Sequence, residues 1–480
     1  MGALCSNYER KAALRQSLAG LGCSLLQIDI PLPAGGYFPL FVPSPVPGVV
    51  VSLKRGHVMP KHKVEAAGVA VVLVGLLWFL ASDALAASKE KVIYSFHGAT
   101  DGASPASNLV ADASGNLYGT TGLGGTGTGC GGGCGTVFEL VKEKGGWKHE
   151  VLHNFVGHPS DGGYPDSLIF GSDGNLYGTT AVGGTGQSDY GTVFELTPTN
   201  GGWAERLLYV AEGSPQSLIF DSSGNLFGVE STGGSRRECY PSGCGAIFEL
   251  VRQVDQTWTE NTIYRFTGGT DGGQPVSIVF DASGKLIGSN EGTGWFRSCR
   301  GTGGCGAIFE LTPGSKGTWT FSVLYQFGRG EGSGIYPGSL IADKDSDVTG
   351  ITFQGGDGFG TIFRLHSTQK QNLQPTNLHL FLGDPDGVQP IGNLLSSDGH
   401  FVGVTFAGGI NKSGTVFDLA WYGDRWHERV LHSFGAAGDG TNPQAGVLEQ
   451  NGHLYGTTGI GGVTDGACPY GCGTVYEIVR

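Results

Sequence analysis

The sequence predicts an all-β protein: a seven-bladed β-propeller of four-stranded blades, closed by an N-terminal strand that completes the last blade. Three observations lead to this prediction. Of the 480 residues, 88 are Gly and only 15% are charged, and no long amphipathic helical pattern is present, as is typical of turn-dense all-β chains. A repeat with strand and turn signals returns seven times. The two ends of the repeat array also complement each other.

Two anchors make the repeat countable. A period of 50 to 62 residues without helical signals indicates a radial array, in which each unit is one small sheet packed on its neighbours. The first anchor is the Gly of an LYGTT-like element, found at Gly119, Gly178, Gly228, Gly288, Gly350, Gly403 and Gly456. The second is a Gly-Thr/Ala-Val/Ile-Phe/Tyr run, which begins at Gly135, Gly191, Gly245, Gly306, Gly360, Gly414 and Gly473.

The second unit shows the strand order of one blade. Residues 167–170 are predicted as a short apolar strand, and a turn at residues 172–175 leads into a second strand over residues 176–180. A third strand is expected over residues 192–196 and a fourth over residues 203–209. Four antiparallel strands make a propeller blade. The Gly inside each second strand lowers β-propensity, so its recurrence indicates close backbone approach.

The ends of the array predict how the ring closes. Residues 92–96 read as a fourth strand without the first three before it, whereas the last unit ends after its third strand, residues 473–479. Pairing these two strands completes the seventh blade and removes two exposed edges. The propeller is therefore assigned to residues 87–480, with repeats that start near residues 92, 151, 207, 263, 324, 378 and 430.

The first 86 residues do not share the repeat. Residues 1–58 contain a Pro-rich segment without a core pattern, and we interpret them as an upstream extension without regular structure. Residues 59–86 read as a signal peptide, with a basic start at Met59, an apolar run and a small-residue cleavage site. Met59 is then the true start. The alternative is an uncleaved signal anchor, because the apolar run is near the lower length limit of a membrane span.

Eight cysteines form four close pairs in the propeller segment, each in the loop between the second and third strands. The loops that carry them are longer than the others, as expected for local disulfides that restrain long loops. A zinc site would need two pairs to converge, and pairs on separate blades are too far apart for this. We therefore predict disulfides formed in an oxidising compartment. The pairs are Cys130/Cys134, Cys239/Cys244, Cys299/Cys305 and Cys468/Cys472.

The net negative charge of the chain limits the classes of partner it can bind. A formal net charge of -13 makes nucleic acid and anionic membrane surfaces poor partners. The mature form is expected to be secreted, periplasmic or at the cell surface, and to contact a membrane only if the signal segment is retained as an anchor. No P-loop, HExxH, GxSxG or dinucleotide fingerprint occurs in a fitting context. No cofactor is expected.

The recurring string of Phe-x-Gly, Asp-Gly, Pro, GNLYGTT, Gly-Gly, GTVFEL and Trp resembles the GloVer-type tandem-repeat proteins, a family of exported bacterial proteins. The resemblance covers about residues 92–480 and is specific in the units that contain Tyr118, Tyr177 and Tyr455. It is weaker in the fifth unit, where residues 345–350 replace the hairpin string and no Trp is present. The resemblance implies export and a repeat array, and it implies no catalytic residues. The blades are also similar to kelch blades, in architecture alone.

The loops that join fourth to first strands and second to third strands lie together on one side, here called the long-loop face. A rigid scaffold usually carries its function on such loops. Five Asp-Gly pairs occur there, and a ring of carboxylates of this kind could hold calcium. We favour turn chemistry, in which each Asp caps its own backbone, because no Asp-rich loop with calcium spacing is present. The five are Asp101, Asp161, Asp271, Asp386 and Asp439.

Two functions fit these observations. A sevenfold scaffold without a reactive motif favours a binding module for an extracellular glycan or protein ligand. The alternative is an extracellular polysaccharide hydrolase or lyase, which needs two carboxylates at a defined separation, one of them with a raised pKa.

The third and fourth units depart from the repeat together, and such departures indicate a constraint other than the fold. Val229-Glu230 and Ser289-Asn290 stand where the first, second and last units have Thr-Thr. The sequence therefore predicts a ligand site on these adjacent blades. The alternative is a set of exposed ion pairs worth under about 1 kcal/mol, with the mouth of the central channel as the next place to expect a site. The predicted site consists of Glu230, Arg236, Arg237, Glu291, Trp295, Arg297 and Arg300.

Overall fold

The structure, a computed structural model, describes residues 25–31, 37–43, 90–184, 190–234, 239, 242–292, 305–328, 334–356, 358–366, 374–464 and 468–479. The chain divides into two compact units, Met1–Leu85 and Ala86–Arg480. Within the described residues, no helix is long and apolar enough to cross a membrane. The predicted signal segment lies outside the described residues.

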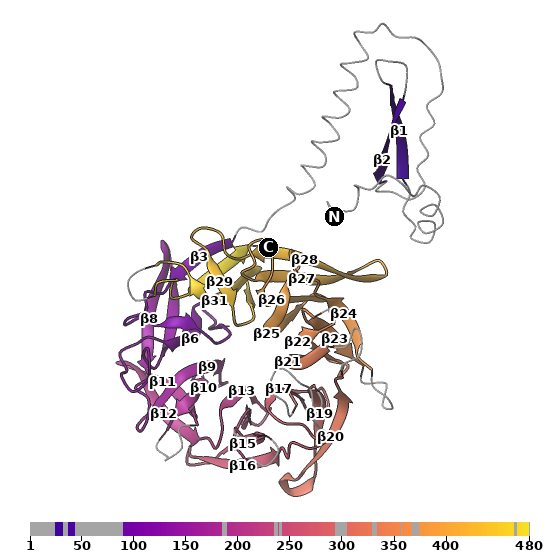
Figure 1. Ribbon diagram of the computed structural model, residues 1–480. Coiled ribbons are helices and arrows are strands. Elements are labelled where there is room, and N and C mark those ends of the chain that lie inside the picture. Colours follow the sequence, from indigo (N-terminus) through magenta and orange to yellow (C-terminus); the bar gives the residue numbers. More distant parts are fainter. Residues whose placement is uncertain are drawn as a thin grey trace. The chain divides into compact units, whose positions relative to one another are not determined.

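Seven antiparallel sheets form the second unit and are arranged radially (Figure 1). The first strands of the sheets lie nearest the centre and the last strands lie at the rim, as Figure 1 shows for β13 and β16. In the first and seventh sheets the innermost strand is split, so that a short strand pairs beside the main path. This is the predicted seven-bladed propeller of four-stranded antiparallel blades.

The strand bounds follow one pattern around the ring. Blades one and two comprise β4 (Ala103–Pro105), β5 (Val110–Ala111), β6 (Leu117–Leu123), β7 (Thr136–Glu143) and β8 (Gly146–Asn154), then β9 (Gly162–Phe170), β10 (Leu176–Gly183), β11 (Thr192–Thr199) and β12 (Gly202–Val210). Blades three and four comprise β13 (Pro215–Phe220), β14 (Leu226–Glu230), β15 (Ala246–Arg252) and β16 (Trp258–Arg265), then β17 (Pro275–Phe280), β18 (Leu286–Asn290), β19 (Ala307–Pro313) and β20 (Trp319–Gln326). Blades five and six comprise β21 (Gly334–Ala342), β22 (Val348–Gly355), β23 (Thr361–Leu365) and β24 (Thr376–Leu380), then β25 (Val388–Ser397), β26 (His400–Ala407), β27 (Thr415–Tyr422) and β28 (Arg425–Ser433). Blade seven comprises β29 (Gly440–Pro443), β30 (Leu448–Gln450), β31 (His453–Gly461), β32 (Thr474–Val479) and β3 (Glu90–Ser95).

The first unit contains one described hairpin, in which β1 (Leu25–Pro31) pairs with β2 (Tyr37–Pro43). The sequence predicted no regular structure in residues 1–58. Both strands are runs of mostly apolar residues, LLQIDIP and YFPLFVP, which are rich in the branched and aromatic types that favour strands. The interpretation of this segment as an upstream extension, followed by a signal peptide, stays a prediction.

Blade two shows how turn residues set the strands. The Gly171 N–H donates to the Asn175 carbonyl at 2.9 Å, and Gly174 takes a φ of 81°, a conformation that Gly adopts without steric cost. The first strand begins at Gly162, earlier than predicted, because a bulge at Thr179 lets it continue along β10. The four strands therefore lie where the sequence placed them, and each is longer.

The N-terminal strand β3 completes blade seven at its rim. It pairs antiparallel with β32, from Glu90 opposite Ile478 to Ser95 opposite Thr474, and the two ends of the propeller lie together in Figure 1. The N–H of Phe96 then donates to the Gly473 carbonyl at 3.0 Å. Backbone hydrogen bonds between the two ends of the propeller thus hold the ring closed, as predicted.

The hydrophobic core lies between neighbouring blades. Tyr118 of blade one meets Trp203 of blade two at 6.2 Å between ring centroids, and Tyr177 meets Trp258 of blade three at 6.0 Å. The Tyr177 hydroxyl donates to Glu195 at 2.8 Å. A buried Tyr needs such a partner for its hydroxyl, so interblade packing explains the recurrent Tyr, Trp and Glu of the repeat.

The Gly of each second strand is a packing position. A Cβ at Gly178 would lie 2.3 Å from Phe194 Cζ and 2.6 Å from the Ser167 carbonyl oxygen. At Gly288 it would lie 2.1 Å from Phe309 Cζ. The expected close approach is therefore present, but a phenyl ring from the third strand supplies much of it, in addition to backbone.

Disulfides join cysteine pairs in the loops between second and third strands. At least one Cys of each described pair is buried and belongs to an interblade cluster, so these bonds fasten the long loops to the core. Three of the four predicted pairs are confirmed within the described residues: Cys130–Cys134, Cys239–Cys244 and Cys468–Cys472.

The fourth predicted pair, Cys299/Cys305, has a different outcome. Cys305 is disulfide-bonded and 1% exposed, and it packs in the cluster between blades four and five. Its predicted partner, Cys299, lies outside the described residues. The bonded state of Cys305 therefore agrees with the sequence analysis, but Cys299–Cys305 is not one of the described disulfides, and this pairing stays a prediction.

Candidate functional site

The central channel of the propeller encloses a cavity of about 820 Å³. Residues of all seven blades line it, mostly from the strands nearest the centre. This volume lies within the range of small-molecule sites, about 300 to 1,000 Å³. Aliphatic side chains alternate there with Ser, Asn, Gln and two carboxylates, Asp166 and Glu291. Among the described residues that line the cavity, none is Lys, Arg or His.

Asp166 lies on β9 and faces this cavity. Thr179 Oγ1 on β10 donates a hydrogen bond to Asp166 Oδ1 at 2.5 Å. Burial raises the pKa of Asp166 to about 7, and the bond from Thr179 opposes part of the rise. The carboxyl group therefore changes charge near neutral pH. Such a group can donate a hydrogen bond when protonated and attract a cation when ionised.

We expect Asp166→Asn to stabilise the propeller above neutral pH and to change its stability little in acid. The native carboxyl has a pKa of about 7, whereas an unfolded Asp titrates near about 3.9. Between these values the native state binds more protons, so the free energy of unfolding falls as pH rises, and the fall is complete above the native pKa. The full shift corresponds to at most about 4 kcal/mol, and the partial solvent exposure of Asp166 reduces this.

Urea unfolding of parent and variant across this pH range measures the effect. Asp398→Asn is the matched control, because Asp398 is exposed in the turn between β25 and β26, and we expect it to leave the pH profile unchanged. A parent protein that gains stability on Asp166 ionisation, relative to the variant, contradicts the prediction.

Glu291 follows β18 and is the second carboxylate of the channel lining. Its N–H donates to the Gln274 carbonyl at 3.1 Å. Burial raises the pKa of its carboxyl. Of the two predicted site residues that the structure describes, Glu230 and Glu291, it is Glu291 that lies in the channel.

Glu230, in contrast, is part of a blade junction. It is 2% exposed at the end of β14, and Oε1 accepts hydrogen bonds from the Tyr209 hydroxyl at 2.9 Å and the Glu212 N–H at 3.1 Å. At the junction before blade one, Asp101 accepts from the equivalent hydroxyl and amide, at 2.8 and 3.0 Å. The loop into blade three has no Asp-Gly pair. Glu230 therefore replaces the missing Asp, which gives this departure from the repeat a structural explanation.

The predicted cluster is thus brought together only in part. Within the described residues, no contact joins Glu230 to Glu291, because one lies at a junction and the other in the channel. The other members lie outside the described residues and stay a prediction: Arg236, Arg237, Trp295, Arg297 and Arg300.

The Asp-Gly carboxylates accept hydrogen bonds from backbone N–H groups of their own loops. Asp271, for example, accepts from Thr267 N at 2.8 Å and from the Tyr264 hydroxyl at 3.0 Å. This arrangement is the turn chemistry that the sequence favoured over calcium. The backbone donors to Asp101, Asp161, Asp386 and Asp439 are His97, Val156, Leu382 and Gly435.

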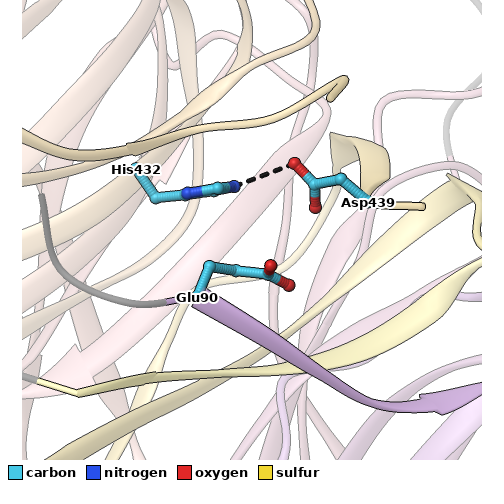
Figure 2. Close-up of side chains that lie close together, drawn as sticks. All are labelled: Glu90, His432 and Asp439. Carbon is cyan, nitrogen blue, oxygen red and sulfur yellow. Dashed lines mark hydrogen bonds and ion pairs between the residues drawn. The ribbon is translucent and has the colours of Figure 1, made fainter. Parts of the chain in front are cut away.

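A second arrangement of chemical interest lies at the outer part of two junctions. In the closing-strand cluster, His432 Nε2 and Asp439 Oδ2 are 2.9 Å apart, and the carboxylate of Glu90 points toward them from β3 (Figure 2). In the blade-six cluster, His379 and Asp386 are joined in the same way and meet Glu428. Within each cluster, one potential ligand atom per residue lies within 4.8 Å of the others.

The glutamates of these clusters are perturbed. Burial and then the Asp439 carboxylate raise the pKa of Glu90 to about 7, while His432 opposes the rise. Burial, followed by Asp386 and Asp418, raises the pKa of Glu428 to about 8. Neither cluster was predicted from the sequence. The available signal was a Glu four residues before the ring position of a rim strand, combined with a His at the ring position of the preceding blade, as in Glu428 and His379. Glu205 and His153 match the same signal, so it marks a set of junctions rather than these two clusters alone.

Sequence comparison identifies a family. The profile of the Gloeobacter/Verrucomicrobia repeat matches residues 81–239 and 294–480, well over half of the chain. No curated protein matches the sequence.

The solved structures to which this chain is similar have low sequence identity to it. The extracellular domain of BT4673 from B. thetaiotaomicron, described as a putative one-component system, is 11% identical with a TM-score of 0.47, over 82% of this chain and 42% of that one. PorZ of Porphyromonas gingivalis, a surface component of the type-IX secretion system, is 14% identical with a TM-score of 0.47, over 81% and 48%. A gluconolactonase from Xanthomonas campestris is 12% identical with a TM-score of 0.38, over 67% and 87%. The chain thus spans less than half of the first two proteins.

Proposed function

The chain belongs to the family of the Gloeobacter/Verrucomicrobia repeat, and on that premise we propose that it is an exported propeller that binds an extracellular glycan in its central channel. The family match speaks for the repeat array. The ligand class is inferred from the chemistry of the channel lining.

The observation that carries the proposal is the composition of the cavity. Its volume of about 820 Å³ suits one or a few sugar rings, and apolar walls with a few polar groups are typical of ligand sites. Asp166, Glu291, Gln216 and Gln444 offer hydrogen-bond acceptors and donors to hydroxyl groups. Because the described lining has two carboxylates and no basic side chain, the ligand class is neutral or amino sugars rather than uronic or sulfated ones.

Export is supported by two independent features. Three described disulfides form and persist in oxidising compartments. The sequence before the propeller has the three regions of a secretory signal peptide. Secretion, the periplasm and the cell surface are all compatible with these features.

The test is a glycan array probed with the full chain, followed by calorimetry on each hit. We expect binding to neutral or amino glycans, and a loss of at least tenfold in affinity for Asp166→Asn or Glu291→Gln, because a removed charged hydrogen bond costs about 1.5 to 3 kcal/mol. Glu212→Gln is the control, since Glu212 is an exposed carboxylate on the long-loop face.

Other outcomes locate the site elsewhere. Hits that are unaffected by either channel variant but lost in Glu230→Gln/Arg297→Ala favour the loop cluster predicted from sequence. Hits restricted to uronic or sulfated glycans contradict the channel proposal.

An enzymatic role is the second candidate, and one observation favours it. The pKa of Asp166, raised to about 7 by burial, suits a general acid near neutral pH. Glu291 supplies a further carboxylate in the same cavity, and glycosidases use two. Release of reducing ends from polysaccharide hits, abolished by Asp166→Asn, is the expected signature of such an activity.

A further inference from the structure

We propose that the closing-strand cluster (Glu90, His432, Asp439) and the blade-six cluster (His379, Asp386, Glu428) bind divalent first-row transition-metal ions of the zinc class. In this proposal the first ion joins the closing strand β3 to the end of blade six, and the second ion joins the rim of blade six to the end of blade five.

The donor set fits such an ion. Each cluster offers one imidazole nitrogen and two carboxylates; the His and Asp lie seven residues apart on one segment, and the Glu comes from a separate one. Zinc sites with three protein ligands of these types keep a fourth position for water. Ligand atoms around a tetrahedral zinc ion are about 3.3 Å apart when each bond is about 2.0 Å. His432 Nε2 and Asp439 Oδ2 are 2.9 Å apart, and all ligand atoms of the cluster lie within 4.8 Å of one another. Small side-chain rotations are therefore sufficient to coordinate an ion.

The glutamates supply the second observation. Glu90 Oε1 and Glu428 Oε1 are buried atoms without a hydrogen-bond partner. A buried carboxylate oxygen without a partner is costly, and in each case the carboxylate faces a His-Asp pair, as Figure 2 shows for Glu90. A bound cation satisfies this oxygen and offsets the negative charge of the two carboxylates.

The other junctions provide an internal comparison. Where the rim-strand ring is Tyr94, the residue that faces it from the next blade is His149, stacked at 4.4 Å between centroids. Where the ring is Tyr264, the facing residue is Phe321, stacked at 4.2 Å. At the junctions of His432 and His379, the facing residue is a glutamate, Glu90 or Glu428. The equivalent position thus carries a stacking ring at these Tyr junctions and a Glu at the His junctions. At the third His junction, Glu205 faces His153 and Asp161, but the three are not among the described clusters with ligand atoms within 4.8 Å.

The donor set also selects the kind of ion. Imidazole suits zinc, copper, nickel or iron, whereas calcium and magnesium favour oxygen ligands only. Carboxylates combined with imidazole and no thiolate are typical of zinc and its neighbours in the first row. We therefore take zinc chloride as the probe and calcium chloride as the ion that should not compete.

The experiment is calorimetric titration of zinc into the full chain after removal of metal with a chelator. We expect Glu90→Gln and Glu428→Gln each to bind one equivalent less than the parent, and a tenfold excess of calcium to leave both equivalents in place. Gln preserves the size of each side chain, and circular dichroism with a thermal melt verifies that the variants fold.

The matched control is Glu260→Gln. Glu260 also lies four residues before the aromatic residue of its rim strand, Tyr264. The aromatic residue next to it in the preceding blade is Tyr209 rather than a His. This variant should keep the full zinc stoichiometry. The melting temperature of the parent should also rise with zinc, because an ion that binds only the folded state stabilises it, and the rise should be smaller in Glu90→Gln.

Two results overturn the proposal. One is a parent chain that binds no zinc in a saturable manner and melts at the same temperature with and without it. The other is unchanged zinc stoichiometry in both Glu90→Gln and Glu428→Gln, which assigns the bound zinc to other residues of the chain.

Discussion

Deletion of residues 87–97 is expected to unfold the whole propeller at ordinary temperature. It removes β3, whose pairing with β32 closes blade seven, and it removes Phe96, which is 0% exposed and packs on Phe138 at 5.2 Å between centroids. Loss of a buried Phe alone costs about 3 to 5 kcal/mol, a large part of the about 5 to 15 kcal/mol of a typical domain. The deletion also leaves β32 and the first blade with uncovered surfaces.

Thermal melts and size-exclusion chromatography measure this effect. Deletion of residues 1–58 is the control, because the hairpin of that segment belongs to the other compact unit, and we expect it to leave the melting temperature unchanged. A monomeric protein without residues 87–97 that melts at the parent temperature refutes the closure argument.

Gly288→Ala is expected to destabilise the propeller by about 3 kcal/mol, within the range of overpacked cores. The added Cβ would lie 2.1 Å from Phe309 Cζ and within 2.8 Å of two further ring atoms. Phe309 is 0% exposed, so its ring cannot move without displacing the interblade core. Chemical denaturation gives the free energy of unfolding directly.

A double-mutant cycle separates this steric cause from general sensitivity of the strand. Phe309→Leu shortens the ring side chain, so Gly288→Ala should cost at least about 1 kcal/mol less in that background, within the coupling range of about 0.5 to 3 kcal/mol for touching residues. Gly145→Ala is the control, since no atom lies within 4 Å of its added Cβ. Strict additivity of the two changes contradicts the proposed contact.

Much of the fold could be predicted because each blade is encoded locally. The turn at residues 171–175 and the apolar strands around it sit within one stretch of chain, and the repeat shows the same signals at regular spacing. The degenerate fifth unit keeps its hairpin too. There the Ser346 N–H donates to the Asp343 carbonyl at 3.0 Å, and Ser346 takes a φ of 61°, so a non-Gly residue adopts the conformation that Gly adopts elsewhere.

The candidate site was harder to predict because it depends on contacts between blades. Glu230 departs from the repeat because it substitutes for an absent Asp in the preceding loop, and only the bonds from Tyr209 and Glu212 show this. Asp166 belongs to no recognisable sequence motif. Its raised pKa arises from burial in a channel that residues of all seven blades line. The closing-strand cluster joins Glu90 to two residues near the other end of the chain. Residues so far apart in sequence are brought together only by ring closure, which a local sequence pattern does not show.

The pairing of β3 with β32 also sets the order in which the chain can fold. Of the propeller strands, β3 is made first and its partner β32 last, so the ring stays open until the propeller segment is complete. Each of the other blades pairs strands that are near in sequence and can form early, whereas closure waits for the most distant contact in the propeller. If the chain is exported during synthesis, in line with the proposed function, β32 is absent when translocation begins and the propeller can close only after export.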